Sequence, residues 1–148
     1  MVIACNTAHL LVPELEMRLG YSFTSLITST VQEISRRDIR KIAILASPTT
    51  IRTKLYEKVL QMNGIEVMLP SQAEQNIVEL TIRDVIAGGG PRRLQQRFTL
   101  VTSRLRNQGA EAILLGCTEL SILYPQERQT LIDPLHIVTD KLLQGETI

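Results

Sequence analysis

Arg40-Lys41-Ile42-Ala43-Ile44-Leu45-Ala46-Ser47-Pro48 is the stretch of sequence that decides the fold. A continuous apolar run stands between a charged pair and Ser47-Pro48, which is typical of a buried strand that leads into a helix. Proline also suits the first turn of a helix, because its missing N–H is not needed there. The stretch therefore predicts a central strand followed directly by a helix.

The segments on either side repeat this alternation of apolar strand and amphipathic helix. Ser71 and Glu74 form a capping-box pattern at one helix start, and Asn63-Gly64 and Gly88-Gly89-Gly90 are typical helix ends. The predicted elements are strands at 24–27, 42–46, 65–69 and 112–116, and helices at 30–37, 49–62, 71–88 and 91–108. This order predicts an α/β fold with a mainly parallel four-stranded sheet flanked by helices.

The first residues of the chain do not fit into that sheet. Met1 to Ala4 also reads as an apolar strand, but no partner strand lies near it in the sequence. We therefore expect an N-terminal portion of a larger protein to be missing.

Composition excludes several classes of function. The 148 residues carry 16 basic and 15 acidic side chains, with three tyrosines, two phenylalanines and no tryptophan, so we expect no binding to nucleic acid or to an anionic membrane. No apolar run approaches the ~20 residues of a membrane helix, and the start does not resemble a signal peptide. We expect a cytoplasmic protein whose two cysteines are free thiols, although spacing alone does not decide against a bridge.

Those two cysteines, Cys5 and Cys117, stand in similar surroundings. Each follows an apolar run and precedes small hydroxyl-bearing residues, in Val2-Ile3-Ala4-Cys5-Asn6-Thr7-Ala8-His9 and Ala112-Ile113-Leu114-Leu115-Gly116-Cys117-Thr118-Glu119. Both blocks predict a strand that delivers a thiol to its carboxyl end, where α/β sheets place ligands. A pair of thiols in one cleft can remove a proton from one face of a carbon acid and return one to the other face.

Such two-base chemistry needs neither a metal nor pyridoxal phosphate, but it needs a thiolate near neutral pH. N–H groups at the helix starts after each cysteine are expected to favour that anion. They and the side chains of Asn6, Thr7 and Thr118 are expected to hold substrate carboxylates. His9 and His136 are interpreted as structural, and two distant cysteines with two scattered histidines lack the spacing of a zinc site.

The blocks Cys5-Asn6-Thr7-Ala8-His9 and Gly116-Cys117-Thr118-Glu119 resemble the two signature motifs of the aspartate/glutamate racemase family. Leu45-Ala46-Ser47-Pro48-Thr49-Thr50 with Tyr56, and Asn107-Gln108-Gly109-Ala110, are similar to further segments of that family. The resemblance covers essentially the whole chain. It implies a cofactor-independent racemase of aspartate or glutamate, in which the substrate lies between two similar α/β domains and each domain supplies one catalytic cysteine.

The resemblance also implies the parts of this chain. Residues 21–129 would be one complete domain, and residues 1–20 and 130–148 would be remnants of the other, with a C-terminal helix at 134–144. Cys5 and Cys117 match the catalytic positions, and a homodimer is expected. The substrate-binding positions would be Asn6, Thr7, Ser47, Thr50 and Thr118, with Glu119 orienting the second cysteine.

Departures from the family leave alternatives open. Most of the first domain has no counterpart here, including a basic substrate-binding residue, and Val85-Ile86-Ala87 stands where some aspartate-specific relatives carry a lysine. One alternative is a non-catalytic remnant that binds small carboxylates or a partner. Another is a related hydantoin racemase or decarboxylase-type enzyme.

Overall fold

The computed structural model of the protein describes residues 1–89, 91–123 and 130–145. Its centre is a parallel sheet of four strands in the order β2-β1-β3-β4. The strands are β1 (Lys41–Ala46), β2 (Glu66–Met68), β3 (Ala112–Gly116) and β4 (Leu131–Ile132). The predicted α/β class and the four-stranded parallel sheet are confirmed.

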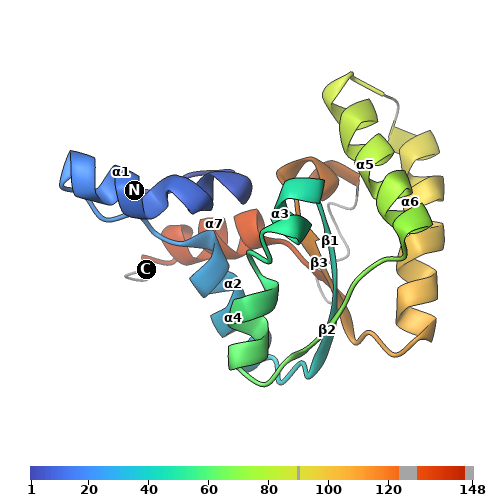
Figure 1. Cartoon of the computed structure of the whole chain (residues 1–148), viewed down its shortest axis with the longest axis horizontal. Coiled ribbons are helices and arrows are strands. Elements are labelled where there is room, and N and C mark those ends of the chain that lie inside the picture. The colour runs from blue at the N-terminus through green and yellow to red at the C-terminus, as the bar shows by residue number, and fades with distance from the viewer. Residues whose placement is uncertain (90, 124–129, 146–148) are drawn as a thin grey trace.

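Helices cover both faces of the sheet (Figure 1). α5 (Gln72–Ile86) and α6 (Pro91–Asn107) pack on one face, where Ala43, Leu45, Ile113 and Leu115 meet Val78, Leu94, Phe98 and Leu105. α2 (Leu26–Arg36), α4 (Glu57–Met62) and α7 (Pro134–Leu143) pack on the other, where Ile42, Ile44 and Leu114 meet Val31, Ile34, Leu60 and Ile137. Successive strand residues therefore alternate between two apolar cores, which explains why β1 and β3 are apolar throughout.

Two predicted strands are wrong. Residues 24–27 do not form a strand, because the Ser25 side chain accepts a hydrogen bond from the Thr28 N–H and starts α2 at Leu26. The run from Met1 to Ala4 makes only an isolated parallel bridge, between Val2 and Thr24. The fourth strand of the sheet is instead β4, which was not among the predicted strands.

The helix predicted at 49–62 is divided in two. α3 (Pro48–Arg52) ends where the Thr53 hydroxyl donates to the carbonyl of Thr49, and Lys54 has a positive φ of 54°. A short turn then leads to α4. This interruption turns the Tyr56 side chain into the core, where it is 1% exposed.

The glycine stop after α5 agrees with the prediction, since Ala87 caps the helix and Gly88 has a φ of 78°. Gly90 lies outside the described residues. The proposed division of the chain at residue 129 also falls outside them, and that division stays a prediction, although β4 pairs with β3 in the same sheet.

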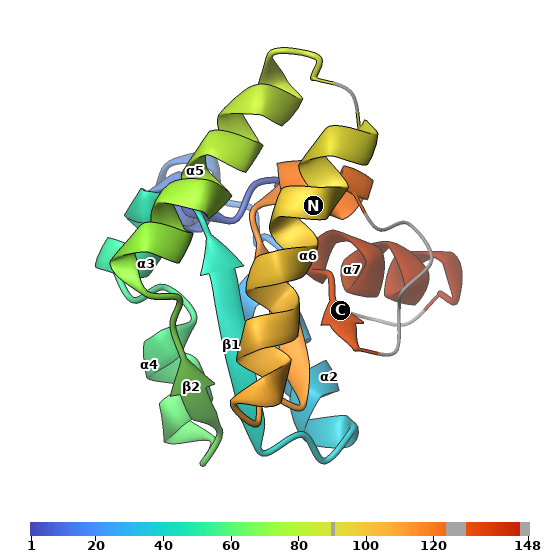
Figure 2. The same ribbon diagram turned by 90° about the vertical axis from the view of Figure 1, so that its right-hand side faces the viewer.

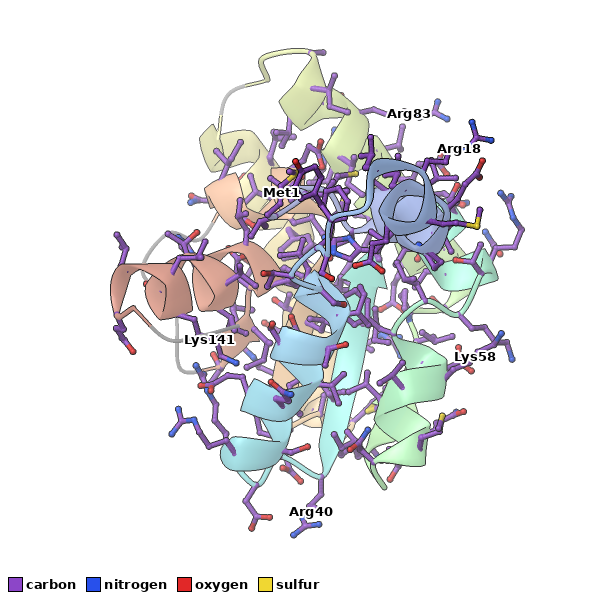
Figure 3. The ribbon with its side chains drawn as sticks, turned by 90° about the vertical axis from the view of Figure 1, so that its left-hand side faces the viewer. Met1, Arg18, Arg40, Lys58, Arg83 and Lys141 are labelled. Carbon is purple, nitrogen blue, oxygen red and sulfur yellow. The ribbon has the colours of Figure 1, made fainter. Side chains whose placement is uncertain are left out.

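The amino-terminal segment consists of the 3₁₀-helix η1 (Thr7–Leu11) and α1 (Val12–Leu19). It lies over one end of the sheet, opposite the end at which Arg40 enters β1 (Figure 3). No helix in the described parts of the chain is long and apolar enough to cross a membrane.

Candidate active site

The candidate site lies where β1 and β3 end. The two strands are parallel neighbours and Ala46 pairs with Gly116, so Ser47 and Cys117 follow paired residues at the same edge of the sheet. The arrow of β1 in Figure 2 points to this edge. A Cβ atom on Gly116 would stand 2.8 Å from the Cβ of Ala46, so this close approach requires glycine. The sheet edge thus fixes the Cys117 block against the Ser47 block.

Cys117 is half-buried and protonated at neutral pH. Its Sγ donates a hydrogen bond to Oε2 of Glu119 at 2.8 Å, in the 3₁₀-helix η2 (Thr118–Leu123). Burial, and after it the hydrogen bond to Glu119 and the charges of Glu119 and Cys5, together raise the pKa of the Cys117 thiol to about 12, while the Glu119 backbone lowers it slightly. For Cys117 the expectation of surroundings that favour the anion is therefore wrong.

Glu119 is the acceptor of that arrangement. Burial raises its pKa, but hydrogen bonds from the Cys117 thiol, its own backbone and the Thr118 hydroxyl outweigh burial and hold the pKa below its usual value. The Thr118 hydroxyl lies 3.2 Å from Oε2. Glu119 is thus a carboxylate that holds the Cys117 proton in place.

Cys5 is an exposed free thiol just before η1. Its carbonyl lies 2.9 Å from Nδ1 of His9, and Nε2 of His9 accepts a hydrogen bond from the Leu26 N–H at 3.0 Å. Because Nε2 accepts, Nδ1 carries the proton and donates to the Cys5 carbonyl. The interpretation of His9 as a structural residue is confirmed, since its ring ties the Cys5 backbone to α2.

Three hydroxyl groups predicted as substrate contacts come together beside Cys5. Thr50 Oγ1 lies 3.3 Å from Thr7 Oγ1 and 3.1 Å from Ser47 Oγ. Ser47 caps α3 by accepting from the Thr50 N–H. The chain of hydroxyls joins the first cysteine block to the end of β1.

Asn6 is 3% exposed, and its Oδ1 accepts a hydrogen bond from the Tyr56 hydroxyl. Burial raises the pKa of Tyr56, so it stays a neutral donor. The Asn6 Nδ2 is buried and has no hydrogen-bond partner among the described residues. An unpaired buried donor beside Cys5 is unfavourable unless a ligand supplies an acceptor.

The predicted residues thus form two groups, and the described part of the chain shows no hydrogen bond between them. Cys117, Thr118 and Glu119 make one group, and Asn6, Thr7, Ser47 and Thr50 make the other. A negative charge on Cys5 is the last of the causes that raise the pKa of Cys117. Tyr56 was missed as a site residue, since its contact with Asn6 spans 50 positions.

A cavity of about 430 Å³ opens beside the Cys117 group, lined by Thr118, Glu119, Ser121, Ile122, Leu135 and His136. Asp133 Oδ2 lies 2.9 Å from Nδ1 of His136. His136 was interpreted as a structural residue, and its contact with Asp133 holds its ring at the start of α7. In the parts of the chain that the structure describes, no three histidine, cysteine or carboxylate side chains cluster as metal ligands.

Comparison with known proteins agrees with this architecture. A family model described as Asp/Glu/Hydantoin racemase matches residues 1–142. The chain is 29% identical over 133 residues to an uncharacterized protein of Pectobacterium carotovorum subsp. carotovorum, covering 88% of this chain and 87% of that protein. It is 28% identical over 123 residues to a broad specificity amino-acid racemase of Bacillus subtilis (strain 168), covering 82% and 52%.

A solved structure gives the same result for the fold. The crystal structure of an aspartate racemase homologue from Pyrococcus horikoshii OT3 superposes with a TM-score of 0.79 at 27% identity, covering 97% of this chain and 65% of that chain. The chain spans about half the length of the curated racemases that it matches, with 52% and 49% covered in two of them.

Proposed function

This chain belongs to the Asp/Glu/Hydantoin racemase family, and from that premise we propose that it racemises an acidic amino acid, aspartate or glutamate, without a cofactor. The observation that carries the proposal is the pair of free thiols at one edge of the sheet. One is exposed, and the other is held as a thiol by Glu119.

The proposed reaction moves one proton on each face of the substrate. The Cys5 thiolate takes the α-proton, so that the C–H bond breaks and an S–H bond forms. The Cys117 thiol then gives its proton to the opposite face of the same carbon and becomes a thiolate. In the reverse direction Cys117 is the base, and Glu119 is placed to accept its proton first.

The remaining residues are proposed to hold the substrate. The unpaired Asn6 Nδ2 and the hydroxyls of Thr7, Ser47 and Thr50 offer donors to a carboxylate on the Cys5 side. The Thr118 hydroxyl does so on the Cys117 side, where Glu119 orients the thiol. Donors fixed in this way before the substrate arrives stabilise the negative charge that develops when the α-proton leaves.

The test is exchange of the α-proton in deuterated water. The whole chain is incubated with each enantiomer of aspartate and glutamate, and loss of the α-proton signal is followed by NMR together with optical rotation. Cys5→Ser and Cys117→Ser are each expected to lower racemisation by about 10²- to 10⁴-fold, since each removes an acid–base group. Thr49→Val, at a threonine next to Thr50 but outside the hydroxyl chain, is the control.

The outcomes of this experiment also decide between the alternatives. Binding of the amino acids without any exchange would favour a non-catalytic carboxylate-binding protein, a reading that the exposure of Cys5 supports. Exchange of hydantoins but not of free amino acids would favour a hydantoin racemase. Full activity in both serine variants would refute the two-cysteine mechanism.

Two further parts of the proposal come from the family resemblance. We propose that the protein is a homodimer, which sedimentation equilibrium tests against one chain of 16.6 kDa. We also propose that it works in the cytoplasm, because the mechanism requires both thiols to stay reduced.

A further inference from the structure

We propose that His136 relays protons between water and Glu119, and thereby restores the protonation state of Cys117 between turnovers. The inference rests on the proposed function. It starts from an asymmetry of the two thiols: Cys5 is exposed and exchanges protons with water directly, whereas Cys117 is half-buried and bonded to Glu119. One turnover leaves Cys5 protonated and Cys117 as a thiolate, so Cys117 needs a path for its proton.

His136 is held in a fixed orientation at the start of α7. Oδ2 of Asp133 lies 2.9 Å from Nδ1 of His136, while Oδ1 of Asp133 accepts from the backbone N–H groups of Leu135 at 2.9 Å and His136 at 3.4 Å. Asp133 is itself 9% exposed. A buried carboxylate on Nδ1 fixes the orientation of the ring.

The other ring nitrogen is available for transfer. Nε2 of His136 has no hydrogen-bond partner within the described residues, and the side chain is 37% exposed, so water reaches it. The cavity that His136 lines is also lined by Thr118 and Glu119 of η2. The hollow has a volume of about 430 Å³ and is wide open to solvent, so water reaches both its His136 and its Glu119 side chains.

The cavity also offers a partner for bridging water. The Ser121 Oγ lines it and is buried with no hydrogen-bond partner in the described structure. For a water molecule bonded to Ser121, Glu119 and His136 are candidate second and third polar partners, because they line the same cavity. His136, Ser121 and Glu119 are therefore the polar groups of a route from the surface to the Cys117 thiol, and the apolar residues Ile122 and Leu135 line it as well.

The transfer balances without any further reactant. The His136 imidazolium gives its Nε2 proton through water to the Glu119 carboxylate, and Glu119 passes a proton to the Cys117 thiolate. The products are neutral imidazole, carboxylate and thiol, and the imidazole regains a proton from solvent. The same steps in reverse remove the Cys117 proton when Cys117 has to act as the base.

His136 acts through Glu119 and is in that sense a positioning residue, so its test needs a readout that a structural role would not change. Racemisation by the whole chain is measured for wild type and His136→Ala across substrate concentrations. At low substrate the two rates are expected to agree within about twofold. At high substrate, where return of the free enzyme limits the rate, the variant is expected to be slower by about tenfold or more.

Added imidazole is expected to restore the high-substrate rate of His136→Ala in proportion to its concentration. Leu135→Ala is the matched control, because it opens the same cavity wall without removing a proton carrier, and imidazole is expected to leave its rate unchanged. His136→Gln keeps a polar side chain and fills the space. It is expected to show the same loss without rescue, and it serves where the alanine variant does not fold.

The outcomes separate the two proposals. An active wild type whose His136→Ala and His136→Gln variants match it at high substrate would overturn the relay and leave the proposed function intact. An active wild type whose His136→Ala variant is slow, but equally slow with imidazole, would also overturn the relay. A wild type without α-proton exchange would overturn both.

Discussion

At the scale of single residues, the two thiols of the site differ in their surroundings. Cys117 shares its proton with Glu119, and this carboxylate raises its pKa in addition to burial. Cys5 lies in the open before η1, with its carbonyl held by His9. In a two-base mechanism the two cysteines would therefore start differently, with Cys117 as a hydrogen-bonded thiol and Cys5 as a thiol open to solvent.

This difference predicts the order of alkylation by iodoacetamide. With a pKa of about 12, roughly one Cys117 side chain in ten thousand is a thiolate at pH 8, so Cys5 is expected to react first and Cys117 very slowly. Glu119→Gln removes a charge that raises this pKa and is expected to speed modification of Cys117 by about tenfold. The measurement is a time course of peptide masses.

Glu111→Gln is the control for that change, because Glu111 is an exposed carboxylate at the other end of β3, where it accepts from the Arg40 N–H. It is expected to leave the Cys117 rate as it is. Equal rates for Cys5 and Cys117 in the wild type would contradict the described environment of Cys117.

Some of the candidate site residues could be chosen from the sequence because they directly follow an apolar run. Cys5, Ser47 and Cys117 each follow an apolar run. The hydroxyl-bearing residues beside them were chosen because they are close to them in the sequence. Tyr56 and His136 could not be placed in this way. Tyr56 reaches Asn6 only because the chain turns at Lys54, and His136 reaches the cavity of Glu119 only because α7 begins beside η2.

At the scale of helices and strands, local capping signals predicted boundaries better than apolar runs did. The Ser71–Glu74 capping box is present as expected, with both reciprocal hydrogen bonds. Leu26 and Ile27 formed the core of an expected strand, but Ser25 caps a helix there and their side chains face the core from α2. β4 has only two residues, Leu131 and Ile132, which is too short for a pattern in the sequence to reveal.

The capping box makes a prediction about the stability of α5. Ser71→Ala removes the Oγ that accepts from the Glu74 N–H at 3.4 Å and donates to Glu74 Oε2 at 2.6 Å. We expect a loss of about 1 kcal/mol in the free energy of unfolding, measured by urea denaturation. Ser103→Ala, at an exposed position inside α6, is the control and is expected to change stability by less than about 0.5 kcal/mol. Equal effects of the two substitutions would argue against the cap.

At the scale of the whole molecule, a parallel sheet covered on both faces leaves its carboxyl edge as the place for ligands. The sequence was sufficient to predict this architecture, because strands β1 and β3 are apolar at every inward position on both faces. It could not predict how the amino-terminal segment is attached. That attachment depends on side-chain contacts, such as Leu26 N–H to His9, that no periodic pattern encodes.

Acid is expected to destabilise the fold in part through Glu33. Its hydrogen bonds with Arg36, together with those of Arg37, overcome burial and lower the pKa of Glu33 from 4.5 to about 2. A lowered folded-state pKa means that the stabilisation is complete above pH 4.5 and is lost as the pH falls from 4.5 to about 2. Glu33→Gln is therefore expected to cost about 1 kcal/mol at pH 7 and almost nothing at pH 2, by urea denaturation.

Glu14→Gln is the matched control, since Glu14 also pairs with an arginine but both partners are more than half exposed, at 52% and 71%. It is expected to cost less than about 0.5 kcal/mol at either pH. A cost for Glu33→Gln that stays constant from pH 7 to pH 2 would contradict the assigned pKa.

The two sulfurs are also anchored differently. Cys117 follows a strand locked by the contact between Gly116 and Ala46, whereas residues 1–11 are attached through Met1 to Thr24, His9 to Leu26 and Thr7 to Thr50. In the proposed mechanism, the distance that the substrate must span between the sulfurs is therefore set by the attachment of residues 1–11 and not by the sheet. To fit a bulkier substrate, residues 1–11 are therefore the segment to replace, because the sheet and the helices that cover it can stay unchanged.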